Sequence, residues 1–426
     1  MAIDEAPRFA GDPMNFGRDC LGPCLVDVAH WVRARARALV ADPCLLFVAR
    51  DGHLLRQVYD RLHPEDRERS HYVLTSRAAV RFAALADPAA VVRELDVCPR
   101  GDTVRNLLIS RFHLLDGPDA PIDPAIAEVL ADPRADLRFA DPAGAAFLGA
   151  SVARLAPLIA ARAARHREHF ARYLRDIVGA RDPVVVDLGY RGTSQRHFAE
   201  VLGRPVAGLY LVTHEEARTL PATVGPTEGW DGDFVSPRRS TSVVSEHRYF
   251  FETVLSADTG AFHHFDADGC PVHAANPQSA VSRDIRTRIH AGVVRAAEAA
   301  VRPPEWPLVS LRDFLVRPAP ADAALFAGLA FEDAYAGAPS LFIVAPSQTR
   351  DDDFAVWVEG QEASDRHHGQ TTPGRSWYAA WERLFVEPRL SKSNFARYRT
   401  NRPLWLARGR HPLVRRYAAM VRFLGL

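Results

Sequence analysis

Two short segments constrain the fold of this 426-residue chain more than any other feature, because each has a continuous apolar run that ends in a sharp polar loop. In the first, "PCLLFVARDG" at 43–52, an apolar run leads into an Arg-Asp-Gly turn. In the second, "VVVDLGYRGTSQRHF" at 184–198, three valines lead to Asp187 and then to two glycines. A short apolar run bounded by turn residues is typical of a strand buried on both faces, as in a parallel sheet.

The segments that follow each loop support the same interpretation. Residues 53–63 and 194–202 have apolar side chains at helical spacing, and the apolar stretches 71–79 and 206–213 come next as further strands. Strand, loop, helix and strand in that order form the unit of a parallel sheet. We therefore expect an α/β fold with an open, mostly parallel sheet flanked by helices, and a ligand at the carboxyl ends of its strands.

The first half of the chain outside these units divides by composition. Residues 1–16 have the pattern of a loose lead-in, and 24–41 have that of an amphipathic helix. Residues 85–178 predict a helical insertion that ends in one long helix or two, with Pro157 as a kink or a boundary. Residues 214–245 are typical of a loop.

The second half is predicted to be mainly helical. Residues 245–269 favour a helix followed by a hairpin, and apolar stretches at 339–347 and 353–360 are candidate strands. The C-terminal segment "HPLVRRYAAMVRFLGL" has the pattern of a basic amphipathic helix. We expect an α/β domain at 17–265, which contains the insertion, and a C-terminal acceptor-binding or docking region at 270–426.

Charge and cysteine usage exclude several classes of function. The net charge of +1 gives no general attraction to nucleic acid, so no nucleic-acid partner is expected. Five cysteines scattered without zinc-ligand spacing favour a reducing compartment.

The N-terminus has no signal pattern and no run of about 20 apolar residues occurs, so we expect a cytoplasmic protein. The basic C-terminal segment predicts at most peripheral contact with the inner face of the membrane, and docking onto the protein is the commoner alternative.

The loop after the second predicted strand has the composition of a phosphate-binding site. A strand, a glycine-rich loop and a helix start direct backbone N–H groups into one concavity beside the positive end of the helix dipole. Gly189 and Gly192 let the backbone approach a phosphate closely. The hydroxyl groups of Thr193 and Ser194 can donate hydrogen bonds, and the Arg191 guanidinium can donate two from a charged group. Asp187 suits sugar hydroxyls or a metal ion. The residues expected to bind substrate are Gly189, Tyr190, Arg191, Gly192, Thr193, Ser194 and Gln195. The structural alternative is a tight turn with a helix N-cap.

Three familiar phosphate sites do not fit the sequence. The only lysine is Lys392, so the loop is not a P-loop, and no G-x-G-x-x-G follows the first strand. Haloacid-dehalogenase-type phosphatases use D-x-D after a strand, and aligning Asp51 with the second acid leaves Ala49 as the nucleophile. Alanine cannot attack phosphorus. An acid beside a Gly-Thr-Ser loop therefore favours a ribose-phosphate ligand.

The segment "VVVDLGYRGTSQ" resembles the phosphoribosyl-diphosphate loop of type I phosphoribosyltransferases, in which an apolar strand, two acids and a spacer precede Thr-Gly-x-Thr. In that family the acids hold the ribose hydroxyls and the Thr/Gly part holds the 5-phosphate. The resemblance gives the first role to Asp187 and the second to Gly192, Thr193 and Ser194. Leu188 stands where a second acid is usual.

About residues 20–265 together resemble a bacterial module of surface-polysaccharide synthesis. That module often follows a haloacid-dehalogenase-type phosphatase domain. The motifs that carry the resemblance are "LGPCLVDVAHWV", "LLFVARDGHLLRQVYDRL", "YVLTSRAAV", "VVVDLGYRGTSQRHFAEVL" and "GLYLVT". It implies transfer of 5-phosphoribose from phosphoribosyl diphosphate (PRPP) to a hydroxyl of a glycan or lipid-linked glycan, with inversion to a β-phosphoribofuranoside. It also implies Mg²⁺ as cofactor, held mostly through substrate with Asp187 as the candidate protein ligand, and a separate partner phosphatase.

The loop after the first strand supports this resemblance. In phosphoribosyltransferases this loop contacts pyrophosphate, which gives that role to Arg50 and to the backbone amides around Gly52. Arg77 in "TSRAA" adds a second positive charge. The structural alternatives are an ion pair between Arg50 and Asp51 and a separate ion pair for Arg77.

A hydroxyl acceptor is a weak nucleophile, so a carboxylate base is expected. Glu252, in the aromatic-rich "YFFETVLSADTG", is one candidate, and Asp51 and Asp187 are the others. A buried glutamate in an ion pair is the alternative for Glu252. His166 and His169, three positions apart on a helix, have the spacing of metal ligands, although exposed helix histidines are commoner.

Two other classes of function remain open from the sequence. One is a phosphoribosyltransferase that acts on a base or small metabolite, and the other is a non-catalytic nucleotide- or phosphate-binding module. The acceptor separates the first from a glycan transferase, and release of pyrophosphate separates either enzyme from a binding module.

Overall fold

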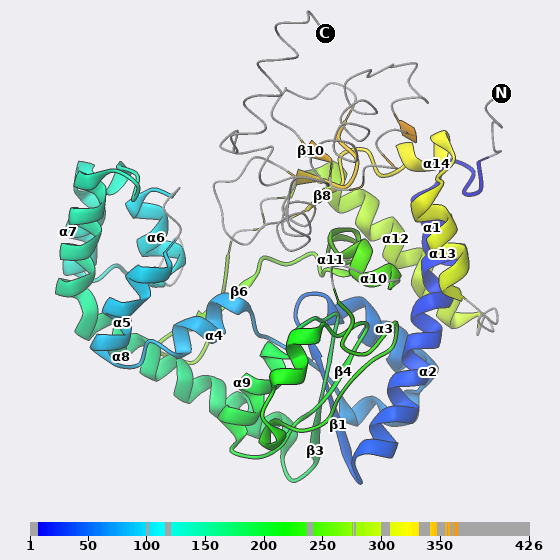
Figure 1. The fold of residues 1–426 in the computed structure, drawn as a ribbon, viewed down its shortest axis with the longest axis horizontal. Coiled ribbons are helices and arrows are strands. Elements are labelled where there is room, and N and C mark those ends of the chain that lie inside the picture. Colours follow the sequence, from blue (N-terminus) through cyan, green and yellow to red (C-terminus); the bar gives the residue numbers. More distant parts are fainter. Residues whose placement is uncertain are drawn as a thin grey trace, which may run out of the picture.

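A computed structural model describes residues 7–364 apart from 99–101, 116–120, 237–241, 275, 277, 300–306, 332–340, 347–353, 356, 358–359 and 361–362. Its centre is a five-stranded, all-parallel sheet in the order β2-β1-β3-β4-β5 (Figure 1). The strands are β1 (Pro43–Val48), β2 (Ser70–Val73), β3 (Asp182–Asp187), β4 (Ala207–Tyr210) and β5 (Thr227–Gly229). The expected α/β fold with a parallel sheet is confirmed.

Helices connect these strands and cover both faces of the sheet (Figure 1). Those near the strands are α1 (Pro13–Phe16), η1 (Gly17–Leu21), α2 (Gly22–Leu39), α3 (Gly52–Leu62), η2 (Pro64–Arg69), α4 (Arg77–Ala83), α9 (Thr193–Leu202), η5 (Glu215–Thr219) and η6 (Ala222–Val224). Those of the insertion are α5 (Pro88–Arg93), η3 (Glu94–Val97), α6 (Val104–Ser110), α7 (Pro124–Ala131), η4 (Pro133–Asp136) and α8 (Pro142–Val178). The insertion predicted at 85–178 is helical as expected.

Among the residues that the structure describes, the elements after the sheet are mostly helical. They are α10 (Val243–Glu246), α11 (Arg248–Leu255), the hairpin β6 (Phe262–Phe265) and β7 (Pro271–His273), α12 (Ala280–Glu298), α13 (Pro307–Val316), α14 (Pro320–Ala324) and the small sheet β8 (Ala330–Phe331), β9 (Leu341–Phe342) and β10 (Phe354–Ala355). Helix α11 followed by the hairpin matches the prediction for 245–269. The predicted C-terminal amphipathic helix lies outside the described residues.

Alternate side chains of the central strands β1, β3 and β4 enter different hydrophobic clusters, which is why these strands read as continuous apolar runs. Leu45 and Phe47 of β1 pack with α2, α3 and α11 on one face. Cys44 and Leu46 pack on the other face with the end of α8 and with Phe198 of α9. Burying such side chains contributes about 1.5–3 kcal/mol each to folding.

Helix α8 is one continuous helix, with Pro157 inside it. Its first half packs against α5, α6 and α7 in a second core, and its second half returns to the sheet (Figure 1). Although no membrane-spanning segment was expected from the sequence, α8 is long and apolar enough to cross a membrane by length and composition. Length and composition alone are weak evidence of a membrane span here, because side chains of α8 belong to two hydrophobic cores and core helices meet the same criteria.

The expected loose lead-in at 1–16 is wrong for its second half, because Phe9 and Phe16 are 1% and 0% exposed. The Phe16 ring lies 5.9 Å from that of Phe250 and 5.1 Å from that of Phe326. Trp357 contacts the same two phenylalanines at 5.5 Å each. Residues on both sides of the proposed boundary at 265 therefore share one core, and the division into 17–265 and 270–426 stays a prediction.

Two strand predictions need correction. The strand expected at 71–79 ends at Val73, because the Ser76 hydroxyl accepts a hydrogen bond from Ala79 N at 3.0 Å and caps α4. Arg77 is consequently the first residue of a helix. The segment 214–245, expected to be a loop, contains β5, whose side chains are only half-buried and give no apolar signal.

Candidate active site

The loops that follow β1 and β3 meet at one edge of the sheet, because these strands are neighbours in parallel register with Phe47 opposite Val186. Asp51 and Asp187 therefore lie at adjacent strand ends. Burial is the main cause of the raised pKa of Asp187 and of Glu252 on α11, and the negative charge of Asp51 adds to both shifts. The structure thus brings together the three carboxyls that the sequence proposes as catalytic.

Asp187 is the most enclosed of these acids, with 9% of its surface exposed. Its Oδ1 accepts a hydrogen bond from Leu188 N at 2.8 Å, and its Oδ2 accepts one from the Ser194 hydroxyl at 3.4 Å. Burial, and then the charge of Asp51, raise the pKa of Asp187 to about 7. This carboxyl is thus partly protonated at neutral pH and can both accept and donate.

Glu252 is held by a tyrosine from the opposite loop. The Tyr190 hydroxyl donates to Glu252 Oε1 at 3.1 Å, and the Tyr190 ring stacks on His214 at 4.6 Å. Burial, and then the charge of Asp51, raise the pKa of Glu252 to about 7. Such a value suits a group that exchanges a proton near neutral pH.

Two arginines face the acids. Burial lowers the pKa of the Arg50 guanidinium, which donates to Thr259 O at 3.4 Å. The charge of Arg77, at the start of α4, partly offsets the rise that burial causes in the pKa of Asp51, of Asp187 and of Glu252. Positive and negative side chains thus lie near one another at the carboxyl ends of β1 and β3.

Asp51 joins this site to the loop after α11. The Ser256 hydroxyl lies 2.8 Å from Asp51 Oδ1, and Ala257 N donates to Arg50 O at 3.2 Å. Burial raises the pKa of Asp51. Gly52 is required next to it, since a Cβ there would lie 2.8 Å from the carbonyl carbon of Phe47.

The start of α9 has the conformation expected of an anion site. Gly192, its N-cap, has φ of +68°, which favours glycine, and no side chain of the described residues caps the helix. Ser194 bonds to Asp187 instead. A Cβ on Gly189 would lie 2.6 Å from Val212 O, so the chain is closely packed here. The first N–H groups of α9 therefore keep their capacity for a ligand.

Three residues of this loop have different surroundings from the others. Thr193 is exposed at the first position of α9. Arg191 is exposed and pairs with Glu216 at 3.2 Å. The Gln195 side chain is 0% exposed and donates to Val206 O at 2.8 Å, so the substrate role predicted for this residue can fall only to its backbone.

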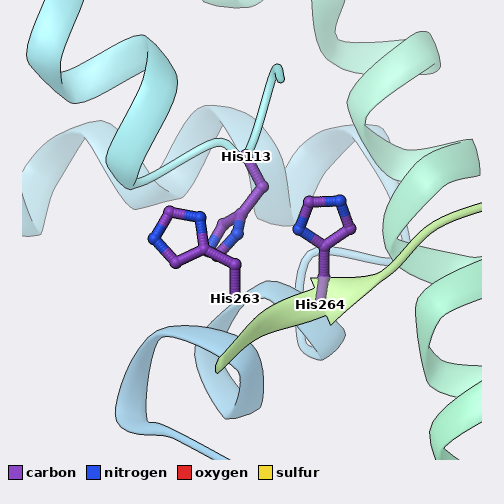
Figure 2. A group of neighbouring side chains, drawn as sticks. All are labelled: His113, His263 and His264. Atoms are coloured by element: carbon purple, nitrogen blue, oxygen red, sulfur yellow. The ribbon is translucent and has the colours of Figure 1, made fainter. Parts of the chain in front are cut away.

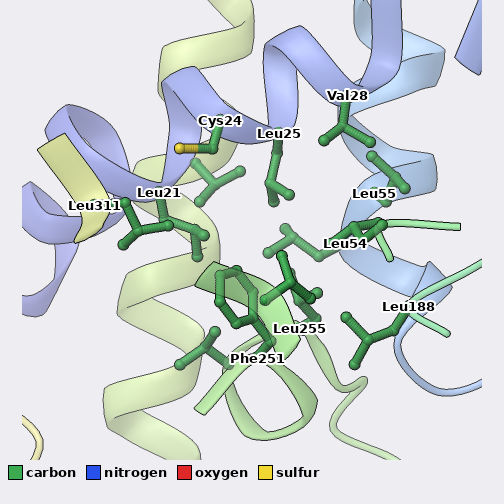
Figure 3. Close-up of a cluster of buried hydrophobic side chains, with 14 of the residues drawn as sticks. Leu21, Cys24, Leu25, Val28, Leu54, Leu55, Leu188, Phe251, Leu255 and Leu311 are labelled. Carbon is green, nitrogen blue, oxygen red and sulfur yellow. The ribbon is translucent and has the colours of Figure 1, made fainter. Parts of the chain in front are cut away.

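Leu188 shows why no second acid follows Asp187. It is 3% exposed and belongs to the apolar cluster that includes Leu54, Phe251 and Leu255 (Figure 3). A carboxylate at this position would be buried among hydrocarbon side chains. The further acids of the site come instead from other segments of the chain.

Arg286 is a site residue that the sequence did not indicate. It lies on α12, is 1% exposed and donates to Asp258 Oδ1 at 2.8 Å. Its Nε and Nη1 have no hydrogen-bond partner among the described residues. Burial lowers its pKa, and the charge of nearby Arg50 lowers it further. The C-terminal half thus adds a cation that only the tertiary fold brings to the site.

The carboxylates do not form a closed metal site. Among the described residues, the one group of three potential ligands whose donor atoms lie within 4.8 Å of one another is His113, His263 and His264. One or two carboxylates that leave room for substrate oxygens nevertheless fit the coordination of Mg²⁺. A metal site at His166 and His169, considered from their spacing, is not supported, because both His166 nitrogens are hydrogen-bonded, to Ala79 O and Phe265 N. The commoner alternative of an exposed helix histidine is also wrong for His166, which is 1% exposed.

No protein-family model and no curated protein matches this sequence. A functional proposal therefore rests on the chemistry of the site and on the sequence motifs.

Proposed function

We propose that this chain transfers 5-phosphoribose from PRPP to a glycan hydroxyl and releases pyrophosphate. The observation that carries the proposal is the meeting of Asp51, Asp187 and Glu252 with arginines beside the open N-terminus of α9. A donor with a phosphate at one end, hydroxyls in the middle and a diphosphate at the other matches this order of groups. In the same proposal, the sheet is that of a type I phosphoribosyltransferase.

The 5-phosphate of PRPP would accept hydrogen bonds from the first backbone N–H groups of α9. Glycine at 192 suits this turn because it adopts φ of +68° and because a Cβ there would lie 2.5 Å from Leu220 Cδ1. The ribose hydroxyls would lie at Asp187, whose carboxyl already accepts from a backbone amide and a serine hydroxyl. Asp187 lies six residues before Thr193, the first residue of α9, so the sugar and the phosphate would lie at the two ends of one short loop.

The pyrophosphate leaving group would lie against the cations. Arg50 and Arg77 are the residues proposed from the sequence, and Arg286 adds a guanidinium with two uncommitted nitrogens. Charge-assisted hydrogen bonds of this kind strengthen as negative charge develops on the leaving oxygen. Mg²⁺, held by substrate oxygens with Asp187 as protein ligand, would supply further neutralisation of that charge.

In the transfer step, the bond between C1 of the ribose and the pyrophosphate oxygen breaks and a bond from the acceptor oxygen to C1 forms. The acceptor proton passes to a carboxylate, for which Glu252 is proposed because its pKa is about 7 and because Asp187, with a similar pKa, would be engaged by the ribose. Attack from the face opposite the leaving group gives the β-phosphoribofuranoside. A separate phosphatase would then remove the 5-phosphate, and a lipid-linked acceptor would place the reaction at the cytoplasmic face of a membrane.

The proposal is tested first by calorimetry of the purified chain with PRPP and Mg²⁺, and then by pyrophosphate release with lipid-linked glycan acceptors. We expect saturable PRPP binding, and turnover that falls by about 100- to 10,000-fold in Glu252→Gln while PRPP affinity is kept. Glu246→Gln is the matched control, because Glu246 is exposed on the neighbouring helix α10.

Absence of PRPP binding by the folded wild-type chain would refute the proposal for both glycan and small-molecule acceptors. Binding without pyrophosphate release from any acceptor would favour the non-catalytic module. Pyrophosphate release with a free base, and none with glycans, would identify the other enzyme class.

A further inference from the structure

Three imidazoles converge at the junction between the helical insertion and the β6–β7 hairpin (Figure 2). His113 lies on the segment after α6, and His263 and His264 are consecutive residues of β6. One nitrogen of each ring lies within 4.8 Å of one nitrogen of each of the others. This group, the histidine cluster, is separate from the carboxylate site and takes no part in the proposed transfer.

A bulge in the hairpin accounts for the arrangement of the two consecutive histidines. Neighbouring residues of a regular strand point to opposite faces. The β6–β7 register shifts between Phe262 and His264, and both histidine side chains rise on the same side of β6 (Figure 2). Bulges commonly redirect a side chain at a functional position.

His113 is held in an unusual backbone conformation. Its φ is +50°, which non-glycine residues rarely adopt, and its ring stacks on Phe82 at 4.5 Å. Sparsely populated conformations of this kind cost about 1–3 kcal/mol and concentrate at functional sites. The surrounding structure thus holds this imidazole against β6 in spite of the unfavourable conformational free energy of the backbone.

The same imidazole lacks the hydrogen bonds that a core histidine normally makes. His113 is 1% exposed, and neither ring nitrogen has a hydrogen-bond partner among the described residues. An unsatisfied buried nitrogen costs about 1–3 kcal/mol. By contrast, nearby His166 has both nitrogens hydrogen-bonded, so the same core can satisfy an imidazole.

We propose that His113, His263 and His264 bind a divalent transition metal ion of the zinc class. Imidazole nitrogens suit Zn²⁺, and three protein ligands with a fourth, solvent-derived ligand are a common zinc geometry. Bonds of about 2.0–2.1 Å separate tetrahedral ligand atoms by roughly 3.4 Å, so small ring rotations suffice from the observed spacing. His263 is only partly buried, which leaves the fourth position open to water.

The metal would join His113 to His263, which are about 150 residues apart in sequence, and would thus close one long loop. It would tie the insertion to the hairpin that follows α11. Binding to the folded state alone also stabilises that state by mass action, so metal removal is expected to lower the melting temperature.

The test uses tag-free full-length chain, stripped with a chelator and titrated with Zn²⁺ in a calorimeter, and with Co²⁺ in a spectrophotometer. We expect one metal per chain and the visible ligand-field bands of four-coordinate Co²⁺. Loss of an outer-shell partner already weakens metal sites by about 10- to 100-fold, so His263→Ala should weaken Zn²⁺ binding by about 100-fold or more.

Two more variants make the result specific. His113→Phe keeps the stacking on Phe82 and should abolish the Co²⁺ bands, whereas His169→Ala should keep them, since His169 lies against the hairpin turn at Gly269 but outside the cluster. Wild-type affinity in folded His263→Ala, or equal losses in His169→Ala, would overturn the proposal. PRPP binding is measured in parallel, so that failure here is distinguished from failure of the proposed transfer.

Discussion

Replacing Asp187 by asparagine should make the ligand-free protein more stable at pH 8 while it removes activity. Asparagine keeps an oxygen for the hydrogen bond from Leu188 N at 2.8 Å and carries no charge. In the folded protein the Asp187 carboxyl keeps its proton up to a pKa of about 7, against an ordinary value of 3.8. Between these values the folded state binds more protons than the unfolded state, so stability falls as pH rises from about 4 to about 7.

The size of this effect follows from the pKa shift. Each unit corresponds to 1.36 kcal/mol, so the shift of Asp187 amounts to about 4 kcal/mol in total. Of this, about 3 kcal/mol develops between pH 5 and pH 8, since part of the titration of the unfolded state lies below pH 5. The asparagine variant has no group that titrates at this position, so its free energy of unfolding does not fall by this amount.

The assay is urea unfolding, followed by tryptophan fluorescence, of wild type and Asp187→Asn at pH 5 and pH 8. The buried histidines titrate equally in both proteins and cancel in the difference between them. We expect the variant to gain about 3 kcal/mol relative to wild type between the two pH values. An unchanged difference would refute the raised pKa, and with it the view that Asp187 lies in a site built for ligand charge.

Further substitutions test neighbouring features. Tyr190→Phe removes a hydrogen bond to the Glu252 carboxylate, so the acidic limb of the pH–rate profile should move to higher pH. Gly192→Ala and Gly203→Ala share φ near +67° and should each cost about 1–2 kcal/mol in urea unfolding; Gly192→Ala should cost more, because a Cβ there meets a leucine at 2.5 Å. Gln195→Leu should cost about 1–3 kcal/mol of stability and leave the PRPP affinity of the folded protein unchanged.

The sheet and its two polar loops could be predicted because their signals are local. The run that ends at Val48 is apolar throughout and the helix after Asp51 has a clear period, so the sequence indicates strand, loop and helix there. Two such units imply neighbouring parallel strands, which predicts that Asp51 and Asp187 meet. Thr227–Gly229 gave no signal because a half-buried edge strand needs no apolar side chains.

The remaining site residues depend on tertiary packing. Gln195 sits among substrate-binding candidates in sequence, yet the turn of α9 directs it into the protein, where it bonds to backbone carbonyls. Arg286 is one of many arginines in α12 and nothing local distinguishes it. His113 lies far in sequence from the β6 histidines, and only the fold brings them together.

The aromatic contacts around Phe16 and Trp357 bear on how the protein is made. Helix α11, which carries Glu252, rests on this core through Phe250, and the core is complete only with Trp357. During synthesis, Trp357 emerges from the ribosome roughly 100 residues after Glu252, which corresponds to roughly 5–20 s of translation. For that interval the nascent chain lacks the ring that completes this core, so α11 and Glu252 can reach their final position only after Trp357 has been added.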